Sequence, residues 1–260
     1  MKLDARKVAL ISVFAALQVV LSRLPGIPVI GLASGRIEPT VLLMPAIGML
    51  LGPWVGGLAV FIGNFIAWLI PSTTFFGMLM LPTAPMGAIA SGALVQRGGR
   101  TGWRVTAAIL LALILLWYIS PPGLIVPYYP ALHLAALALV LALRGRVAEL
   151  MERGDRRGMA WGAFIASLSG MMANHMVGNL IFISSVGWFV QLKGIRDAIA
   201  AMGFSWLKSG LPKEDPTGLG ALFAITFPIY IVERILMTLI AVPIAVGIIY
   251  TLRRSGVVKL

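Results

Sequence analysis

Apolar residues in this chain occur in long runs that are separated by short stretches containing proline, glycine and charged residues. A helix needs about 20 apolar residues to cross the hydrocarbon core of a bilayer, so such runs predict transmembrane helices. Eight runs are candidates, over about residues 7–24, 38–51, 54–70, 77–96, 104–120, 130–144, 160–186 and 220–252. The second and sixth are short, so we expect an all-α polytopic bundle of six to eight spans.

We expect residues 1–260 to form a single transmembrane domain. The first run follows a basic N-terminus, but no small-residue cleavage site followed by a polar domain is present, so we interpret it as a retained helix. The longest polar connection, residues 190–218, predicts an extracellular loop with a short interfacial helix and a turn at Leu211-Pro212. This loop is equally compatible with a lid and with an ordinary connector.

Composition agrees with the hydrophobic pattern. The chain is 59% hydrophobic and 12% charged, so the bilayer must act as its solvent. The net charge of +12 does not indicate nucleic-acid binding, because the basic residues form short clusters and not a stripe interleaved with aromatic residues. Most of them, for example Arg97, Arg144 and Arg253, fall in segments that are cytoplasmic if the number of crossings is even. We therefore expect a plasma-membrane protein with both termini in the cytoplasm.

The sequence contains no recognisable catalytic or metal-binding motif. It has no cysteine, nine acidic residues and two histidines, His133 and His175, that lack H-E-x-x-H spacing. No carboxylate cluster that could hold magnesium, no G-x-S-x-G turn and no phosphate-binding loop is present. We expect a protein that is not an enzyme and that needs no metal or cofactor. If ATP drives it, a partner hydrolyses the ATP.

Polar residues inside the predicted spans are the strongest functional signal, because each is costly in lipid unless it faces a partner or a ligand. All three asparagines of the chain lie in such spans, and helical rise places them in the outer half of the bilayer. We predict that the polar residues of these outer halves form one pocket that binds a small, partly planar solute. The candidate binding residues are Arg36, Glu38, Asn64, Trp68, Asn174, His175, Asn179, Tyr230, Glu233 and Arg234.

Helical spacing places Asn64 with Trp68 on one face, and the same spacing joins His175 to Asn179 and Tyr230 to Arg234. Glu233 and Arg234 are adjacent and point about 100° apart, so we expect one of them to pair with another helix, with Glu38 as a candidate for Arg234. Interhelical hydrogen bonding alone is the competing interpretation of the buried Asn and His residues. Arg23 and Arg36 could simply extend to the outer headgroups, and His133 is interpreted as structural.

The first helix carries small residues at helical spacing, Ala5 with Ala9 and Ser12 with Ala16. Such pairs allow a neighbouring helix to approach closely, either within this protein or on a partner.

The order of these features resembles the substrate-binding (S) component of energy-coupling factor (ECF) vitamin transporters. The resemblance rests on the small residues of the first helix, a Pro/Gly-rich loop from Pro25 to Glu38, the turn Gly52-Pro53-Trp54-Val55-Gly56, the stretch Gly63-Asn64-Phe65 and a following Pro71. It is best over residues 1–97, and the runs within 104–144 look like an extra hairpin between the fourth and fifth family helices.

The resemblance implies a six-helix bundle that binds a vitamin or related micronutrient near the outer face. It also implies a transmembrane coupling protein and two cytoplasmic ATPases as partners, with Ala5, Ala9, Ser12 and Ala16 contacting the coupling protein. Two alternatives remain open. A self-sufficient secondary transporter could use Glu38, Glu233 and His175 as proton groups, and a membrane assembly subunit would bind no small solute.

Overall fold

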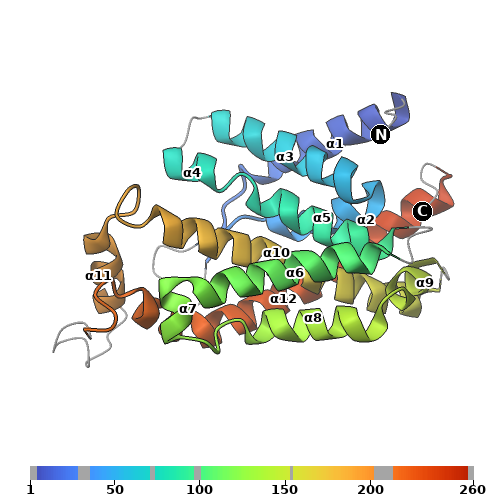
Figure 1. The fold of residues 1–260 in the computed structure, drawn as a ribbon. Coiled ribbons are helices and arrows are strands. Elements are labelled where there is room, and N and C mark those ends of the chain that lie inside the picture. Colours follow the sequence, from blue (N-terminus) through green and yellow to red (C-terminus); the bar gives the residue numbers. More distant parts are fainter. Residues whose placement is uncertain are drawn as a thin grey trace.

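The computed structural model describes residues 5–28, 36–70, 74–96, 101–152, 155–201 and 213–256. Apart from a two-residue antiparallel ladder that pairs β1 (Ile27–Pro28) with β2 (Arg36–Ile37), its regular structure is helical. The helices are α1 (Ala5–Leu21), α2 (Thr40–Leu51), α3 (Pro53–Leu69), α4 (Phe75–Leu79), α5 (Thr83–Val95), α6 (Gly102–Ile119), α7 (Pro121–Ile125), α8 (Ala131–Leu143), α9 (Arg146–Glu152), α10 (Arg156–Ser185), α11 (Leu192–Ala201) and α12 (Leu219–Arg254) (Figure 1).

Each of the eight apolar runs overlaps a helix, and the run 77–96 is divided between α4 and α5. Within the described residues, three helical segments have both the length and the hydropathy of a membrane span: the broken helix Phe75–Val95, α6 and α12. The pair α8 and α9, bent by 76°, makes a fourth if it counts as one span. The apolar helices α2 and α3 are shorter. The described part of the chain is therefore almost entirely helical, with three to four candidate spans.

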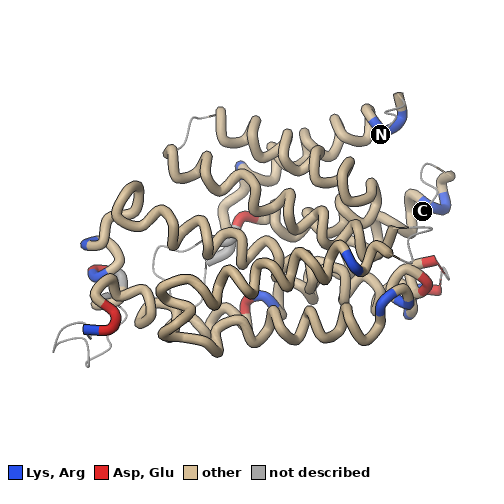
Figure 2. Tube along the Cα trace, viewed as in Figure 1, with Lys and Arg blue, Asp and Glu red and all other residues tan. Residues whose placement is uncertain are grey.

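Helix α10 lies at the centre of the bundle and packs against α2, α5, α6, α8, α9 and α12. Helices α1, α2, α3 and α5 form a group of neighbours on one side. Helix α1 begins and α12 ends at the same end of the bundle, whereas α11 lies at the opposite end (Figure 1). Figure 2 shows that charged residues gather at these two ends and are sparse between them, as expected for a protein whose middle lies in hydrocarbon.

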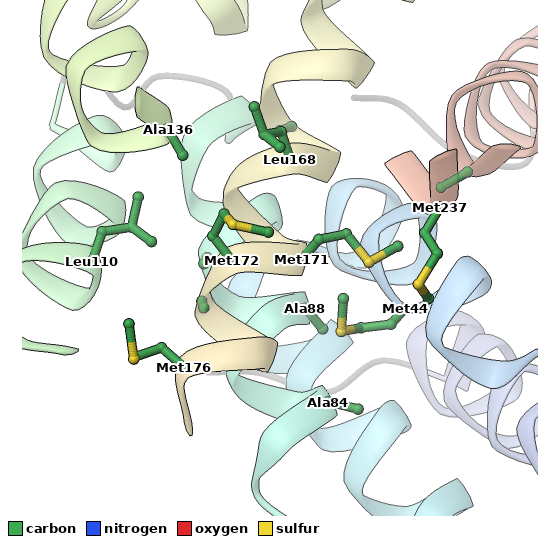
Figure 3. Close-up of a cluster of buried hydrophobic side chains, with 14 of the residues drawn as sticks. Met44, Ala84, Ala88, Leu110, Ala136, Leu168, Met171, Met172, Met176 and Met237 are labelled. Carbon is green, nitrogen blue, oxygen red and sulfur yellow. The ribbon is translucent and has the colours of Figure 1, made fainter. Parts of the chain in front are cut away.

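Methionine and small residues form the core around α10. Met44, Met171 and Met237 are buried and point toward one another between α2, α10 and α12, beside alanines of α5, while the buried Met172 lies on the side of α10 nearer Leu110 and Ala136 (Figure 3). Unbranched methionine fills the irregular gaps between helices that approach one another closely. Glycine allows α10 to approach α5 closely: a Cβ on Gly170 would lie 2.7 Å from the carbonyl oxygen of Gly87.

The segment predicted as an outer loop contains α11, which packs on α12 through the buried Ile195 and Ile199. The chain returns to α12 through Asp215, a buried carboxylate that accepts a hydrogen bond of 2.8 Å from the backbone N–H of Ala221. This contact satisfies a free N–H in the first turn of α12. The predicted turn at Leu211-Pro212 lies outside the described residues.

Candidate binding site

A cavity of about 910 Å³ lies between the helices, toward the end of the bundle opposite to the start of α1. Its walls come from the C-terminal ends of α1 and α3, the N-terminal ends of α2 and α5, the second half of α10 and the first half of α12. The broken helix α4–α5 contributes because its turn places Met80 and Leu81 at the wall. The volume lies in the range of about 300–1,000 Å³ that is typical of small-molecule sites.

Nine of the ten predicted binding residues line this one cavity: Glu38, Asn64, Trp68, Asn174, His175, Asn179, Tyr230, Glu233 and Arg234. They come from four regions, the segment before α2 and the helices α3, α10 and α12, so the bundle brings together residues that are up to about 200 positions apart in the sequence. The physical reason is that a polar group in an apolar helix faces the interior to avoid lipid. For the tenth residue, Arg36, the structure describes the backbone of β2 and not the side chain.

Two charged residues of the cavity wall, Glu233 and Arg234, form an ion pair with each other. Arg234 Nη2 lies 2.8 Å from Glu233 Oε1, and the two side chains are 14% and 10% exposed. The prediction that one of them pairs with another helix was therefore wrong for Arg234. The long side chains bend toward each other despite the 100° offset of their Cα–Cβ bonds, which leaves Glu38 to accept a hydrogen bond of 3.2 Å from Thr40.

Tyr129 lines the same cavity, although no sequence pattern marked it as a candidate. It precedes α8, is buried, and its hydroxyl accepts a hydrogen bond of 3.3 Å from Asn179 Nδ2. Its backbone carbonyl accepts a hydrogen bond of 2.5 Å from the Tyr230 hydroxyl. Tyr129 therefore joins the hairpin formed by α6 and α8 to α10 and α12. The Tyr-Tyr-Pro sequence at 128–130 marks a turn and does not reveal which ring points inward.

The two histidines meet behind the cavity wall. His175 lines the cavity, His133 is 1% exposed on α8, and His175 Nδ1 lies 3.4 Å from His133 Nε2. The interpretation of His133 as structural did not foresee this contact. The available signal was that two isolated histidines in apolar helices each need a polar partner.

Arg23 and Trp68 line the cavity where α1 and α3 end. Arg23 lines the cavity and its Nη2 donates a hydrogen bond of 2.6 Å to the carbonyl of Ala67, which ties the end of α1 to α3. Extension to lipid headgroups, the simple interpretation of this arginine, is therefore incomplete. Trp68 Nε1 donates a hydrogen bond of 3.2 Å to the carbonyl of Thr74, so the indole is fixed at the cavity edge.

The cavity combines balanced charge with aromatic rings. Two guanidinium groups, of Arg23 and Arg234, face two carboxylates, of Glu38 and Glu233. Six rings add flat apolar surface, and they belong to Trp68, Phe76, Tyr129, Phe182, Phe223 and Tyr230. Such a lining can stack a planar group and orient it through amides and charged groups. In the described part of the chain, no group of three His, Cys, Asp or Glu side chains could hold a metal ion.

The small residues of the first helix lie away from the cavity. Ala5, Ala9, Ser12 and Ala16 are all exposed and share one side of α1, whereas Ile11, Phe14 and Gln18 are buried on the other. This face is therefore open to a neighbour from outside the chain.

The chain is similar to proteins of one transporter family. The family model described as "ECF-type riboflavin transporter, S component" matches residues 2–152, which include the hairpin at 104–144. An uncharacterized protein of Methanocaldococcus jannaschii is 30% identical over 209 residues, which are 80% of this chain and 59% of that relative. The chain thus spans less than two thirds of the relative. No solved structure matches it significantly.

Proposed function

We propose that this chain, which belongs to the family of ECF-type riboflavin transporter S components, is the membrane-embedded subunit that captures a small vitamin-like solute for import. The family consists of transporter subunits and not of enzymes. The sequence agrees with this assignment, because it carries none of the catalytic motifs considered above.

The observation that supports this proposal most strongly is the convergence of the polar intramembrane residues on one cavity. Their positions are spread over the segment before α2 (Glu38), α3 (Asn64), α10 (Asn174 and Asn179) and α12 (Arg234), yet all line the same 910 Å³ space. Polar groups that only joined helices would be distributed among several interfaces. A cavity at the end of the bundle remote from both chain ends would receive its solute from outside if the termini are cytoplasmic.

Riboflavin is the first solute to test. The cavity has the flat aromatic surface that suits its fused rings, and amide and charged groups that suit its polar ring edge and its hydroxylated side chain. Helices α10 and α12 lie beyond the matched residues and supply Asn174, His175, Asn179 and the Glu233–Arg234 pair. Half of the polar lining is therefore specific to a part of the chain that the family model does not cover.

We further propose that an ATP-driven partner complex completes the importer. The exposed small-residue face of α1 (Ala5, Ala9, Ser12, Ala16) supports this, because it allows the close helix approach that a membrane-embedded coupling protein needs. Reconstituted without partners, the protein should bind solute but not accumulate it. Accumulation in vesicles without an ATPase would instead indicate a secondary transporter.

The test is a titration of the purified protein in lipid nanodiscs with riboflavin, followed by quenching of flavin fluorescence. We expect saturable quenching that Asn174→Ala weakens by about tenfold or more, since one polar contact to a ligand contributes about 1–1.5 kcal/mol. Ser184→Ala is the matched control, because Ser184 lies on the same helix, is exposed, and among the described residues its side chain bonds only to the carbonyl of Leu180. Native mass spectrometry of the gently purified protein identifies any other co-purifying solute. Absence of both riboflavin binding and a co-purifying metabolite would contradict the proposal.

A further inference from the structure

The two histidines of the chain form a pair that joins the cavity to α8. His175 Nδ1 and His133 Nε2 are 3.4 Å apart, and the two rings are inclined by 18°. Only His175 lines the cavity. Its Nε2 makes no hydrogen bond to a described residue, so this atom is the one available to a solute.

The direction of the hydrogen bond follows from the environment of His133. A neutral histidine carries one proton, on Nδ1 or on Nε2. If His175 donated from Nδ1, then His133 Nε2 would be the acceptor and His133 would carry its proton on Nδ1. That nitrogen is buried and has no hydrogen-bond partner among the described residues. A buried N–H without a partner is rarer and more costly than a buried acceptor without one.

The opposite direction avoids this cost. His133 then carries its proton on Nε2 and donates it to His175 Nδ1, which leaves only a lone pair on the buried His133 Nδ1. His175 must in turn carry its own proton on Nε2. Protonation of both nitrogens is disfavoured, because His133 is buried and no carboxylate bonds to either ring in the described residues.

We propose that His133 is a positioning residue that holds His175 in its Nε2–H form, so that the cavity presents an N–H donor to the solute at this point. The tautomer is a property of the protein alone. The recognition that follows from it rests on the proposed function: the solute places a hydrogen-bond acceptor, such as a carbonyl oxygen or an unprotonated ring nitrogen, against His175 Nε2.

Neighbouring rings fix the direction in which this donor points. Tyr230 stacks on His175 with a centroid distance of 4.8 Å and an angle of 24°, and the Tyr129 ring lies at 6.1 Å and 26°. An N–H bond lies in the plane of its ring, so the stacked rings restrict the acceptor to that plane. A planar solute whose acceptor is on its edge meets this restriction when it lies nearly parallel to Tyr230.

The tautomer can be measured directly by ¹⁵N NMR. Because the chain has two histidines, protein labelled at histidine ring nitrogens gives four signals, provided that the purification tag contains no histidine. Protonated and unprotonated ring nitrogens are well separated in ¹⁵N shift. At mildly alkaline pH and without solute, we expect Nδ1 of both residues to be unprotonated and Nε2 of both to carry the proton. A protonated Nδ1 on His175 overturns the proposal.

Two substitutions separate positioning from packing. His133→Leu removes the donor, and we expect the two His175 signals to move toward each other as both tautomers become populated. His133→Gln keeps an N–H that can reach His175 Nδ1, and we expect the His175 signals to stay near their original positions. A purely structural His133 predicts equal effects of the two substitutions on these signals, and that result would also overturn the proposal.

Riboflavin binding then tests recognition. We expect His133→Leu to weaken binding by about three- to tenfold and His133→Gln to restore most of the loss, because one hydrogen bond to the solute is at stake. Equal affinities in all three proteins would overturn the recognition step. If riboflavin binds none of them while the NMR result is as expected, the choice of riboflavin in the proposed function fails and the tautomer assignment stands.

Discussion

The side-chain amide of Asn179 on α10 donates a hydrogen bond of 3.3 Å to the hydroxyl of Tyr129 in the turn before α8. Both side chains line the cavity, so this contact fixes an amide and a hydroxyl at the surface that a solute would meet. The Tyr129 hydroxyl also makes a side-chain hydrogen bond with Thr226, whereas the amide oxygen of Asn179 has no hydrogen-bond partner among the described residues. The pair therefore presents a fixed acceptor, the Asn179 amide oxygen, to the solute.

This arrangement predicts that the two residues act on binding as a unit. Tyr129→Phe and Asn179→Ala should each weaken riboflavin binding by about three- to tenfold, corresponding to about 1 kcal/mol. The double variant should lose less than the sum of the two single losses, because either change disorders the remaining partner. Fluorescence titrations of the four proteins give the coupling energy. Strictly additive losses would show that the two groups act independently.

The ion pair between Glu233 and Arg234 predicts a different pattern. Glu233→Gln leaves a guanidinium that is only 14% exposed without its carboxylate, so we expect it to lower the free energy of unfolding by roughly 2–4 kcal/mol. Glu233→Gln together with Arg234→Gln removes both charges and should recover part of that stability. Thermal unfolding in detergent measures both effects.

Binding distinguishes the structural from the recognition role of this pair. The double variant should remain unable to bind riboflavin with native affinity even where its stability recovers, because the charged groups line the cavity. A double variant that is stable and binds normally would assign the pair to structure alone.

The helices and the lining of the cavity follow from one constraint that is visible in sequence. Apolar runs long enough for a bilayer form helices because the backbone must satisfy its hydrogen bonds internally in lipid. The same cost drives Asn64, Asn174 and Asn179 inward, which is why nine residues could be predicted to share one pocket. What lay beyond prediction depends on side-chain direction within the pocket. Examples are the mutual pairing of Glu233 with Arg234, and the inward orientation of Tyr129.

The span count illustrates a second limit. Hydropathy locates the segments but not their tilt or breaks, and the structure divides 77–96 between α4 and α5 and bends the chain by 76° between α8 and α9. These breaks fall at Pro82 and at Arg144, whose φ of 47° lies in the left-handed region. They are also useful, because the turn between α4 and α5 forms part of the cavity wall.

The exposed face of α1 predicts a separation between binding and import. Ala9→Trp places a bulky ring where a coupling protein would approach, so ATP-dependent uptake in cells should fall severely while riboflavin binding stays within about twofold of native, because Ala9 does not line the cavity. Leu17→Trp is the control, since Leu17 is also exposed on α1 but lies beside the small-residue line. Equal uptake by the two variants would contradict a docking role for this face.

Close packing at glycine sets the distance between α2, which follows Glu38, and α5, which follows the α4–α5 turn. A Cβ on Gly92 would overlap the backbone carbonyl of Gly48, which cannot move without shifting α2. We expect Gly92→Ala to destabilise the protein by about 1–3 kcal/mol through overpacking, and to weaken solute binding because the cavity wall moves with α2 and α5.

Gly247→Ala on α12 is the matched change, since a Cβ there meets nothing within 4 Å. Replacing a helical glycine at such an open position should stabilise the protein by roughly 0.5–1 kcal/mol and leave binding unchanged. Thermal unfolding midpoints and riboflavin titrations of both variants measure the contrast. Equal behaviour of the two would show that the contact between α2 and α5 relaxes at little cost and does not determine the shape of the cavity.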